Sequence, residues 1–155
     1  MAKGQTTRHR PYFGLALAAL MTGAALAGAP TNQPTRLVDP AEVPGAALYG
    51  VGTIRPLARN AEGQVLLAIA ELPAGAVTPP HAGADGRVRF ATVLSGTLYY
   101  ADGDTIDPVA EVAHGPGSIL RIAPDTVHWA AARDGDVRFL VSIVPADAPV
   151  AALAE

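Results

Sequence analysis

Closely spaced turns divide most of this sequence into short apolar segments, and this feature constrains the fold more than any other. From residue 46 onward no segment has both the length of a helix and an apolar repeat of about 3.6 residues. Gly, Pro and Asp-Gly signals instead bound short strands, which we predict at residues 64–72, 87–94, 97–101, 118–123, 127–132 and 137–144. Strands in this number, without crossover helices, bury their apolar faces against one another. The predicted fold class is therefore all-β: a sandwich, a barrel or a jelly roll.

The composition excludes several kinds of site. Half of the residues are hydrophobic but only 5% are aromatic, so the core must be built from Ala, Val, Leu and Ile. The chain contains no cysteine. This excludes disulfide bonds and thiolate metal sites, and it leaves His and carboxylate side chains as metal ligands. Nucleic-acid binding needs a clustered basic surface, but the net charge is −3 and the arginines are scattered. We therefore expect no nucleic acid among the partners.

The N-terminal segment has the three-part layout of a secretory signal peptide. Residues 1–10 are polar and basic, residues 13–29 are apolar and uncharged, and the small residues Ala25 and Ala27 lie near the end of the apolar run. We predict a cleavable signal peptide over residues 1–27 and export to the periplasm or the extracellular space. The alternative is a membrane anchor, but the run is short against the roughly 20 residues of a membrane-spanning helix. We expect no stable membrane anchor after cleavage.

Three further segments follow the leader. Residues 28–45 carry four prolines and little periodicity, which predicts an extended linker or arm. The β-domain is predicted over residues 46–146, and residues 147–155 form a C-terminal tail that is loose or makes a short helical turn. Once the leader is removed, 8 basic residues face 14 acidic ones, so the exported chain carries a net charge near −6.

Two histidine-containing segments have a similar layout. In the first, Gly75 is followed after five residues by His81, and the sequence Val-Leu-Ser-Gly ending at Gly96 lies in the next strand. In the second, Gly117 opens a strand that ends in a Pro-containing turn before His128. In their order and separation the two segments resemble the conserved motifs of the cupin superfamily, over about residues 50–145. The resemblance is to small bacterial single-domain cupins, and it implies a double-stranded β-helix, the jelly-roll or cupin barrel.

The metal-binding motif of the family is degenerate in this chain. In the family three histidines and a glutamate hold a divalent metal, and His81 and His128 match the first and last of these histidines. The second histidine position falls on Gly83 and the glutamate position falls on Arg89. A retained metal (Fe, Mn, Zn or Ni) would need a replacement ligand, for which Asp85 is the best nearby carboxylate. The alternative is that this aspartate caps its own turn.

The arginines of the same segment suggest an anion site. If Arg89 points into the barrel, Arg87 should point the same way, because side chains two residues apart share one face of a strand. With the two histidines they would form a cationic cup that holds a carboxylate or phosphate bidentately. The alternative is that both arginines point outward and pair with acidic residues. Of the adjacent Tyr99 and Tyr100 one must face inward, and we predict Tyr99 as the ligand-binding residue.

Three classes of function remain open. The first is an exported binding protein with a small-molecule pocket in the barrel, a reduced or absent metal site and no assigned reaction. The alternative, which the family resemblance implies, is a metal-dependent dioxygenase, isomerase or decarboxylase with His81 and His128 as ligands. The third is a structural domain that pairs as a homodimer through its edge strands. The missing ligand positions favour the first class.

Overall fold

The computed structural model describes residues 34–83 and 85–144. The predicted signal peptide (1–27), the start of the predicted arm and the predicted tail (147–155) lie outside these residues. Within the described ranges, nine strands and one 3₁₀ turn make up the secondary structure, which confirms the all-β class. No helix in this part of the chain is long and apolar enough to cross a membrane.

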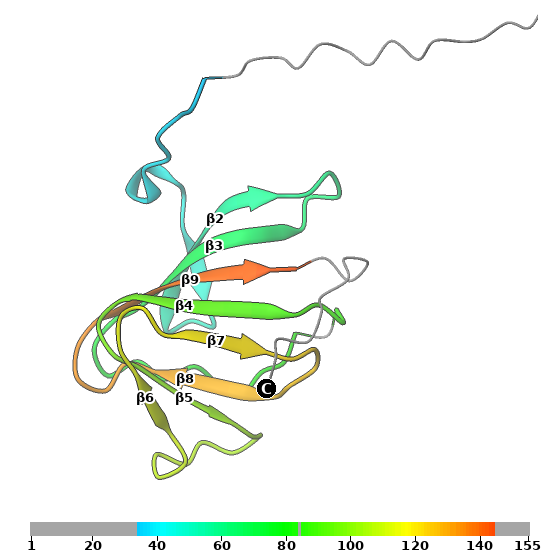
Figure 1. The fold of residues 1–155 in the computed structure, drawn as a ribbon. Coiled ribbons are helices and arrows are strands. Elements are labelled where there is room, and N and C mark those ends of the chain that lie inside the picture. Colours follow the sequence, from blue (N-terminus) through cyan, green and yellow to red (C-terminus); the bar gives the residue numbers. More distant parts are fainter. Residues whose placement is uncertain (1–33, 84, 145–155) are drawn as a thin grey trace, which may run out of the picture. The chain divides into compact units, whose positions relative to one another are not determined.

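The nine strands form two antiparallel sheets (Figure 1). The larger sheet has the order β1-β2-β3-β9-β4-β7, and its strands are β1 (Ala46–Leu48), β2 (Gly52–Arg59), β3 (Val65–Leu72), β9 (Val137–Ile143), β4 (Arg89–Ser95) and β7 (Ile119–Ile122). The smaller sheet has the order β6-β5-β8, and its strands are β6 (Val112–His114), β5 (Leu98–Asp102) and β8 (His128–Ala131). The 3₁₀ turn η1 (Pro40–Glu42) precedes β1. Two sheets of this kind enclose a core, as a jelly roll requires.

All six strands predicted from apolar runs are present, whereas β1, β2 and β6 were not predicted. β2 lacks a clean alternation because it contains Pro56, which has no N–H for the ladder, and the charged residues Arg55 and Arg59. Its register with β3 shifts just after Pro56. β1 and β6 have only three residues each, which is too short to show an alternating pattern.

The core between the sheets consists mainly of aliphatic side chains. In the larger sheet, Phe139 of β9 lies between Ala70 of β3 and Val93 of β4 in adjacent register positions. Leu98 and Ala130 of the smaller sheet belong to the same buried cluster. The predicted core of Ala, Val, Leu and Ile is therefore confirmed.

The inner face of β4 places Arg89 at the end of a buried row. Ala91 and Val93 are only 3% and 1% exposed, and Arg89 precedes Ala91 by two residues, so its side chain faces the same way. In register, Arg89 lies opposite Ile122 of β7 and Ile143 of β9. A charged side chain is thus held on an inner face that is otherwise apolar.

Candidate ligand-binding site

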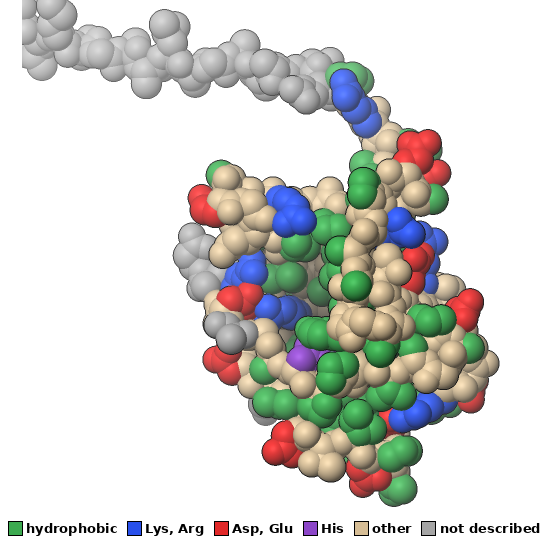
Figure 2. Space-filling model, turned by 180° about the vertical axis from the view of Figure 1, so that it is seen from behind, with side chains coloured by type: hydrophobic (Ala, Val, Ile, Leu, Met, Phe, Trp, Pro, Cys, Tyr) green, Lys and Arg blue, Asp and Glu red, His purple; other side chains and the backbone are tan. Residues whose placement is uncertain are grey.

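A cavity of about 170 Å³ lies between the two sheets. Most of its lining is aliphatic, and several positions that would fill a barrel carry alanine instead, among them Ala70, Ala91 and Ala130. Small side chains at these inner positions leave the space open. The remaining lining is Tyr49, Thr78, His81, Gly83, Arg89, Tyr100, His128 and Phe139. Figure 2 shows a hollow in the surface of the β-domain, with a histidine (purple) in it and basic side chains (blue) beside it.

His81 and His128 are brought together by the backbone. The N–H of His81 donates to the carbonyl oxygen of His128 at 2.9 Å, and the N–H of His128 donates to the carbonyl oxygen of His81 at 3.0 Å. The ring centroids are 4.3 Å apart. The pairing predicted from the two motifs therefore exists, and both side chains line the cavity.

Both imidazoles are fixed in the same tautomer by short contacts. The Nδ1 atom of His81 lies 2.9 Å from the carbonyl oxygen of Pro79, and the Nδ1 atom of His128 lies 2.9 Å from the carbonyl oxygen of Thr126. A carbonyl only accepts, so each Nδ1 carries the hydrogen and each neutral ring has its lone pair on Nε2. Burial lowers the pKa of both histidines, and the positive charge of Arg89 lowers it further, which favours the neutral form.

Two tyrosines extend the histidine pair into a row of four rings. The ring of Tyr49 is 4.1 Å from that of His81, and the ring of Tyr100 is 5.2 Å from that of His128 and stacked on it. Tyr49 stands in the turn between β1 and β2 with φ of 52°, a left-handed conformation that is uncommon for a bulky residue. The turn geometry thus presents this tyrosine to the cavity.

Arg89 fills the space that a side chain at position 83 would occupy. A Cβ atom built on Gly83 would overlap the guanidinium group of Arg89. The two departures from the motif that this chain resembles, Gly83 and Arg89, are therefore one spatial exchange. The guanidinium of Arg89 occupies the space that a histidine side chain at position 83 would fill. The Arg89 side chain is 17% exposed and lines the cavity, so of the two orientations left open the inward one holds for this residue.

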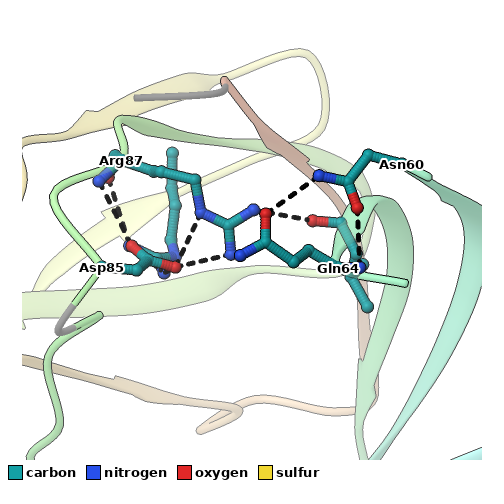
Figure 3. A network of polar contacts seen from close by, with 6 residues as sticks. Asn60, Gln64, Asp85 and Arg87 are labelled. Carbon is teal, nitrogen blue, oxygen red and sulfur yellow. Dashed lines mark hydrogen bonds and ion pairs between the residues drawn. The ribbon is translucent and has the colours of Figure 1, made fainter. Parts of the chain in front are cut away.

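Asp85 is held by two arginines. Its carboxylate accepts from Arg87 Nε at 2.8 Å and Nη2 at 2.6 Å, and from Arg89 Nη2 at 2.9 and 2.8 Å. Partial burial opposes its charged form, but these hydrogen bonds and the arginine charges lower the pKa of Asp85 to about 2. Figure 3 shows the Arg87–Asp85 pair beside the turn that carries Asn60 and Gln64.

The donor set does not fit the divalent metal that the fold family implies. Gly83 offers no ligand atom, Arg89 only donates hydrogen bonds, and both Asp85 oxygens are already bonded to guanidinium groups. Within residues 34–83 and 85–144 no group of three or more His, Asp or Glu side chains could hold a metal ion. Two imidazoles next to a fixed positive charge would bind a hard cation poorly.

Two of the predicted ligand-binding residues lie elsewhere. Arg87 precedes β4, so the strand parity that links it to Arg89 does not apply, and its guanidinium contacts Asp85 and the carbonyl oxygen of Val65 instead of the cavity. Tyr99 is not part of the lining either, because Leu98 and Tyr100 occupy the inner face of β5. Its hydroxyl donates to Asp134.

Sequence reasoning also missed lining residues that the structure brings in. Tyr49 and Leu48 lie at the end of β1, a strand with no pattern of its own. Thr78 is 2% exposed, and its Oγ1 accepts the N–H of Ala130 at 2.9 Å. The one local sequence signal for these residues was the pair Tyr49-Gly50, because glycine is common in turns. In the structure this pair forms a turn in which both residues have positive φ.

No family model and no curated protein matches this sequence. Solved structures do match. A predicted oxalate decarboxylase from Thermotoga maritima aligns with a TM-score of 0.58 at 16% identity, over 71% of this chain and 99% of that one. The polyketide cyclase RemF from Streptomyces resistomycificus aligns with a TM-score of 0.56 at 23% identity, over 76% and 83%. An RmlC-like cupin from Shewanella frigidimarina aligns with a TM-score of 0.53 at 13% identity, over 76% and 96%.

At these identities the likeness concerns the fold, and it agrees with the two-sheet topology and with the paired histidine motifs. The β-domain of this chain has the cupin fold.

Proposed function

We propose that this protein binds a small organic anion with an apolar body in the cavity of its barrel, without a divalent metal. The observation that carries the proposal is the position of Arg89, whose guanidinium fills the space beside Gly83 and lines the cavity together with His81 and His128. A guanidinium group binds carboxylate and phosphate oxygens through paired N–H donors.

The local charge balance supports an anion. Arg87 and Arg89 bring two positive charges, and Asp85 between them brings one negative charge. Burial favours neutral imidazoles, so the histidines add no charge of their own. Asp102 lies opposite His128 in register, but it is exposed at the end of β5 and is not part of the cavity lining. The three groups together carry one net positive charge, and of them Arg89 lines the mainly apolar cavity, where screening by water is weak.

The cavity sets the size of the ligand. Its volume of about 170 Å³ is close to that of an engineered apolar cavity of about 150 Å³ that binds benzene. A compact acid of about six to eleven non-hydrogen atoms fits this space. Larger acids would have to project out of the cavity.

A metal-dependent enzyme is the second candidate, and one observation favours it. Both histidines donate Nδ1–H to a backbone carbonyl and leave Nε2 free, and metal-binding histidines are commonly oriented by a hydrogen bond of this kind. Solved structures with the same fold carry enzyme descriptions, among them the polyketide cyclase and a sugar phosphate isomerase. The metal would then have to share the space with the Arg89 guanidinium.

The experiment is a metal analysis combined with a thermal shift screen. The protein is purified without an affinity tag or chelator, and its metal content and its melting temperature with benzoate and short-chain carboxylates are measured. We expect substoichiometric metal and stabilisation by at least one acid that is lost in Arg89→Ala. Arg121→Ala is the matched control, because Arg121 is exposed on β7 and faces away from Arg89. A stoichiometric metal that is lost in His128→Ala would refute the proposal.

We also propose that the chain is exported and then processed. The layout of residues 1–27 supports this, with a basic start, an uncharged apolar run and small residues before position 28. The test is expression of the full chain in a bacterial host, followed by mass analysis of the periplasmic and culture fractions. A product that begins at about Gly28 is expected. A full-length chain that stays in the membrane would contradict export.

A further inference from the structure

We propose that the cavity selects acids that also carry a hydroxyl group, so that the ligand class is a compact hydroxycarboxylic acid with an apolar body. This inference rests on the proposed anion binding and deepens it. Its basis is the contrast between Arg89, which can only donate hydrogen bonds, and the Nε2 atoms of His81 and His128, which can only accept them in the tautomer that the structure fixes.

Every polar atom of His81 and His128 other than Nε2 already has a hydrogen-bond partner. The backbone N–H and C=O groups of His81 and His128 bond to each other, and each Nδ1 bonds to a carbonyl oxygen two residues earlier in the chain. Neither Nε2 has a hydrogen-bond partner among residues 34–83 and 85–144. Since both rings line the cavity, these two lone pairs are what the histidines offer to a ligand.

A simple carboxylate can bind to Arg89 but leaves both Nε2 acceptors unpaired. Its oxygens match the guanidinium of Arg89, but the same oxygens repel an imidazole lone pair. A hydroxyl group on the ligand supplies the missing hydrogen. The four-ring row of Tyr49, His81, His128 and Tyr100 and the aliphatic walls then contact the apolar body. A site that bonds a ligand hydroxyl discriminates against the analogue that lacks it, because its own acceptor is then left unpaired.

The test is calorimetric titration of the purified protein with matched acids. One series compares benzoate with the three hydroxybenzoates and the three methoxybenzoates, which carry the oxygen without its hydrogen. The other compares 3-methylbutanoate with 2-hydroxy-3-methylbutanoate. We expect at least one hydroxy acid to bind about tenfold more tightly than both its deoxy and its methoxy partner, as one added hydrogen bond predicts.

Variants assign the preference to the histidines. His81→Phe and His128→Phe keep an aromatic ring and remove Nε2, so we expect them to bind benzoate and to lose the preference for the hydroxyl. His114→Phe is the control, because His114 lies in β6 and not in the cavity lining. The fluorescence of the single tryptophan and the melting temperature show whether each variant folds.

The outcomes separate this inference from the proposed function. Equal affinity for hydroxy, methoxy and deoxy acids, with binding that is lost in Arg89→Ala, would overturn the hydroxyl preference and leave anion binding intact. A preference that persists in both histidine variants would also overturn it. If no acid of either series binds, both the inference and the proposed function are refuted.

Discussion

Gly83→Ala probes the contact between the two residues that replace metal ligands. The new Cβ would overlap the Arg89 guanidinium, which therefore has to leave its place beside the histidines. The Gly83 backbone does not have a positive φ, so alanine meets no conformational strain there. The perturbation therefore acts on the position of one charged group.

The effects on stability and on binding should differ in size. The displaced ion pair with Asp85 is partly exposed and contributes about 1 kcal/mol or less. The smaller conformational freedom of alanine in the unfolded chain offsets about 0.4–1 kcal/mol of this. The net change in unfolding free energy should stay within about 1 kcal/mol, a shift of no more than about 5 °C in melting temperature. A lost charged hydrogen bond to the ligand is worth about 1.5–3 kcal/mol, which weakens acid binding about 10- to 150-fold.

The assay is calorimetric titration with the best acid from the screen, together with thermal unfolding of the same sample. Gly115→Ala is the matched control, because its Cβ would meet no atom within 4 Å and its φ is not positive. We expect wild-type affinity for the control and a weakened affinity for Gly83→Ala at nearly unchanged stability. Wild-type affinity in Gly83→Ala would show that the guanidinium position does not determine binding.

Thr78→Val leaves the buried N–H of Ala130 without its side-chain acceptor, so urea unfolding should show a loss of about 1–3 kcal/mol, and an unchanged unfolding free energy would contradict this. Asp85 has a pKa of about 2 in the fold, below its unfolded value of about 4, so its stabilisation is present above about pH 4 and is lost as the pH falls toward 2. Urea unfolding of Asp85→Asn at several pH values should therefore show a flatter dependence than wild type over this window, and equal slopes would refute the assignment. Finally, the double variant Gly83→His/Arg89→Glu should bind a stoichiometric divalent metal in equilibrium dialysis while each single variant does not; metal binding by Gly83→His alone would contradict the spatial exchange.

Two of the strands that the sequence revealed, β3 and β9, have few exposed side chains. β3 and β9 are apolar runs bounded by turn residues, and such runs mark strands whatever the topology. β2 was not predicted, because Pro56 interrupts its alternating pattern. Pairing with the neighbouring strand β3 stabilises it as a strand. The cavity walls formed by β1 and β2 were consequently absent from the sequence-based site.

Side-chain direction was the harder part of the site. Local alternation says that two neighbouring positions face opposite ways, but it does not say which of them faces the core. For β5 the buried Leu98 decides the matter, and Tyr100 rather than Tyr99 lines the cavity. For Arg87 the parity rule failed because β4 begins only at Arg89.

The spatial exchange between Gly83 and Arg89 was visible in the sequence only as two separate departures. Their contact depends on how the loop before β4 folds back over the strand, and no residue pattern encodes that distance. Asp85 explains part of it, because its bonds to both arginines tie this loop to the start of β4.

Acid binding before and after removal of metal distinguishes an anion site at Arg89 from a metal site at the two histidines. The same acid is titrated into untreated protein, into protein dialysed against a chelator, and into chelator-treated Arg89→Ala. We expect equal affinity in the first two titrations and no measurable binding in the third, because Arg89 and not a metal holds the acid. Binding that disappears with the chelator, returns with added metal and survives in Arg89→Ala would contradict this expectation.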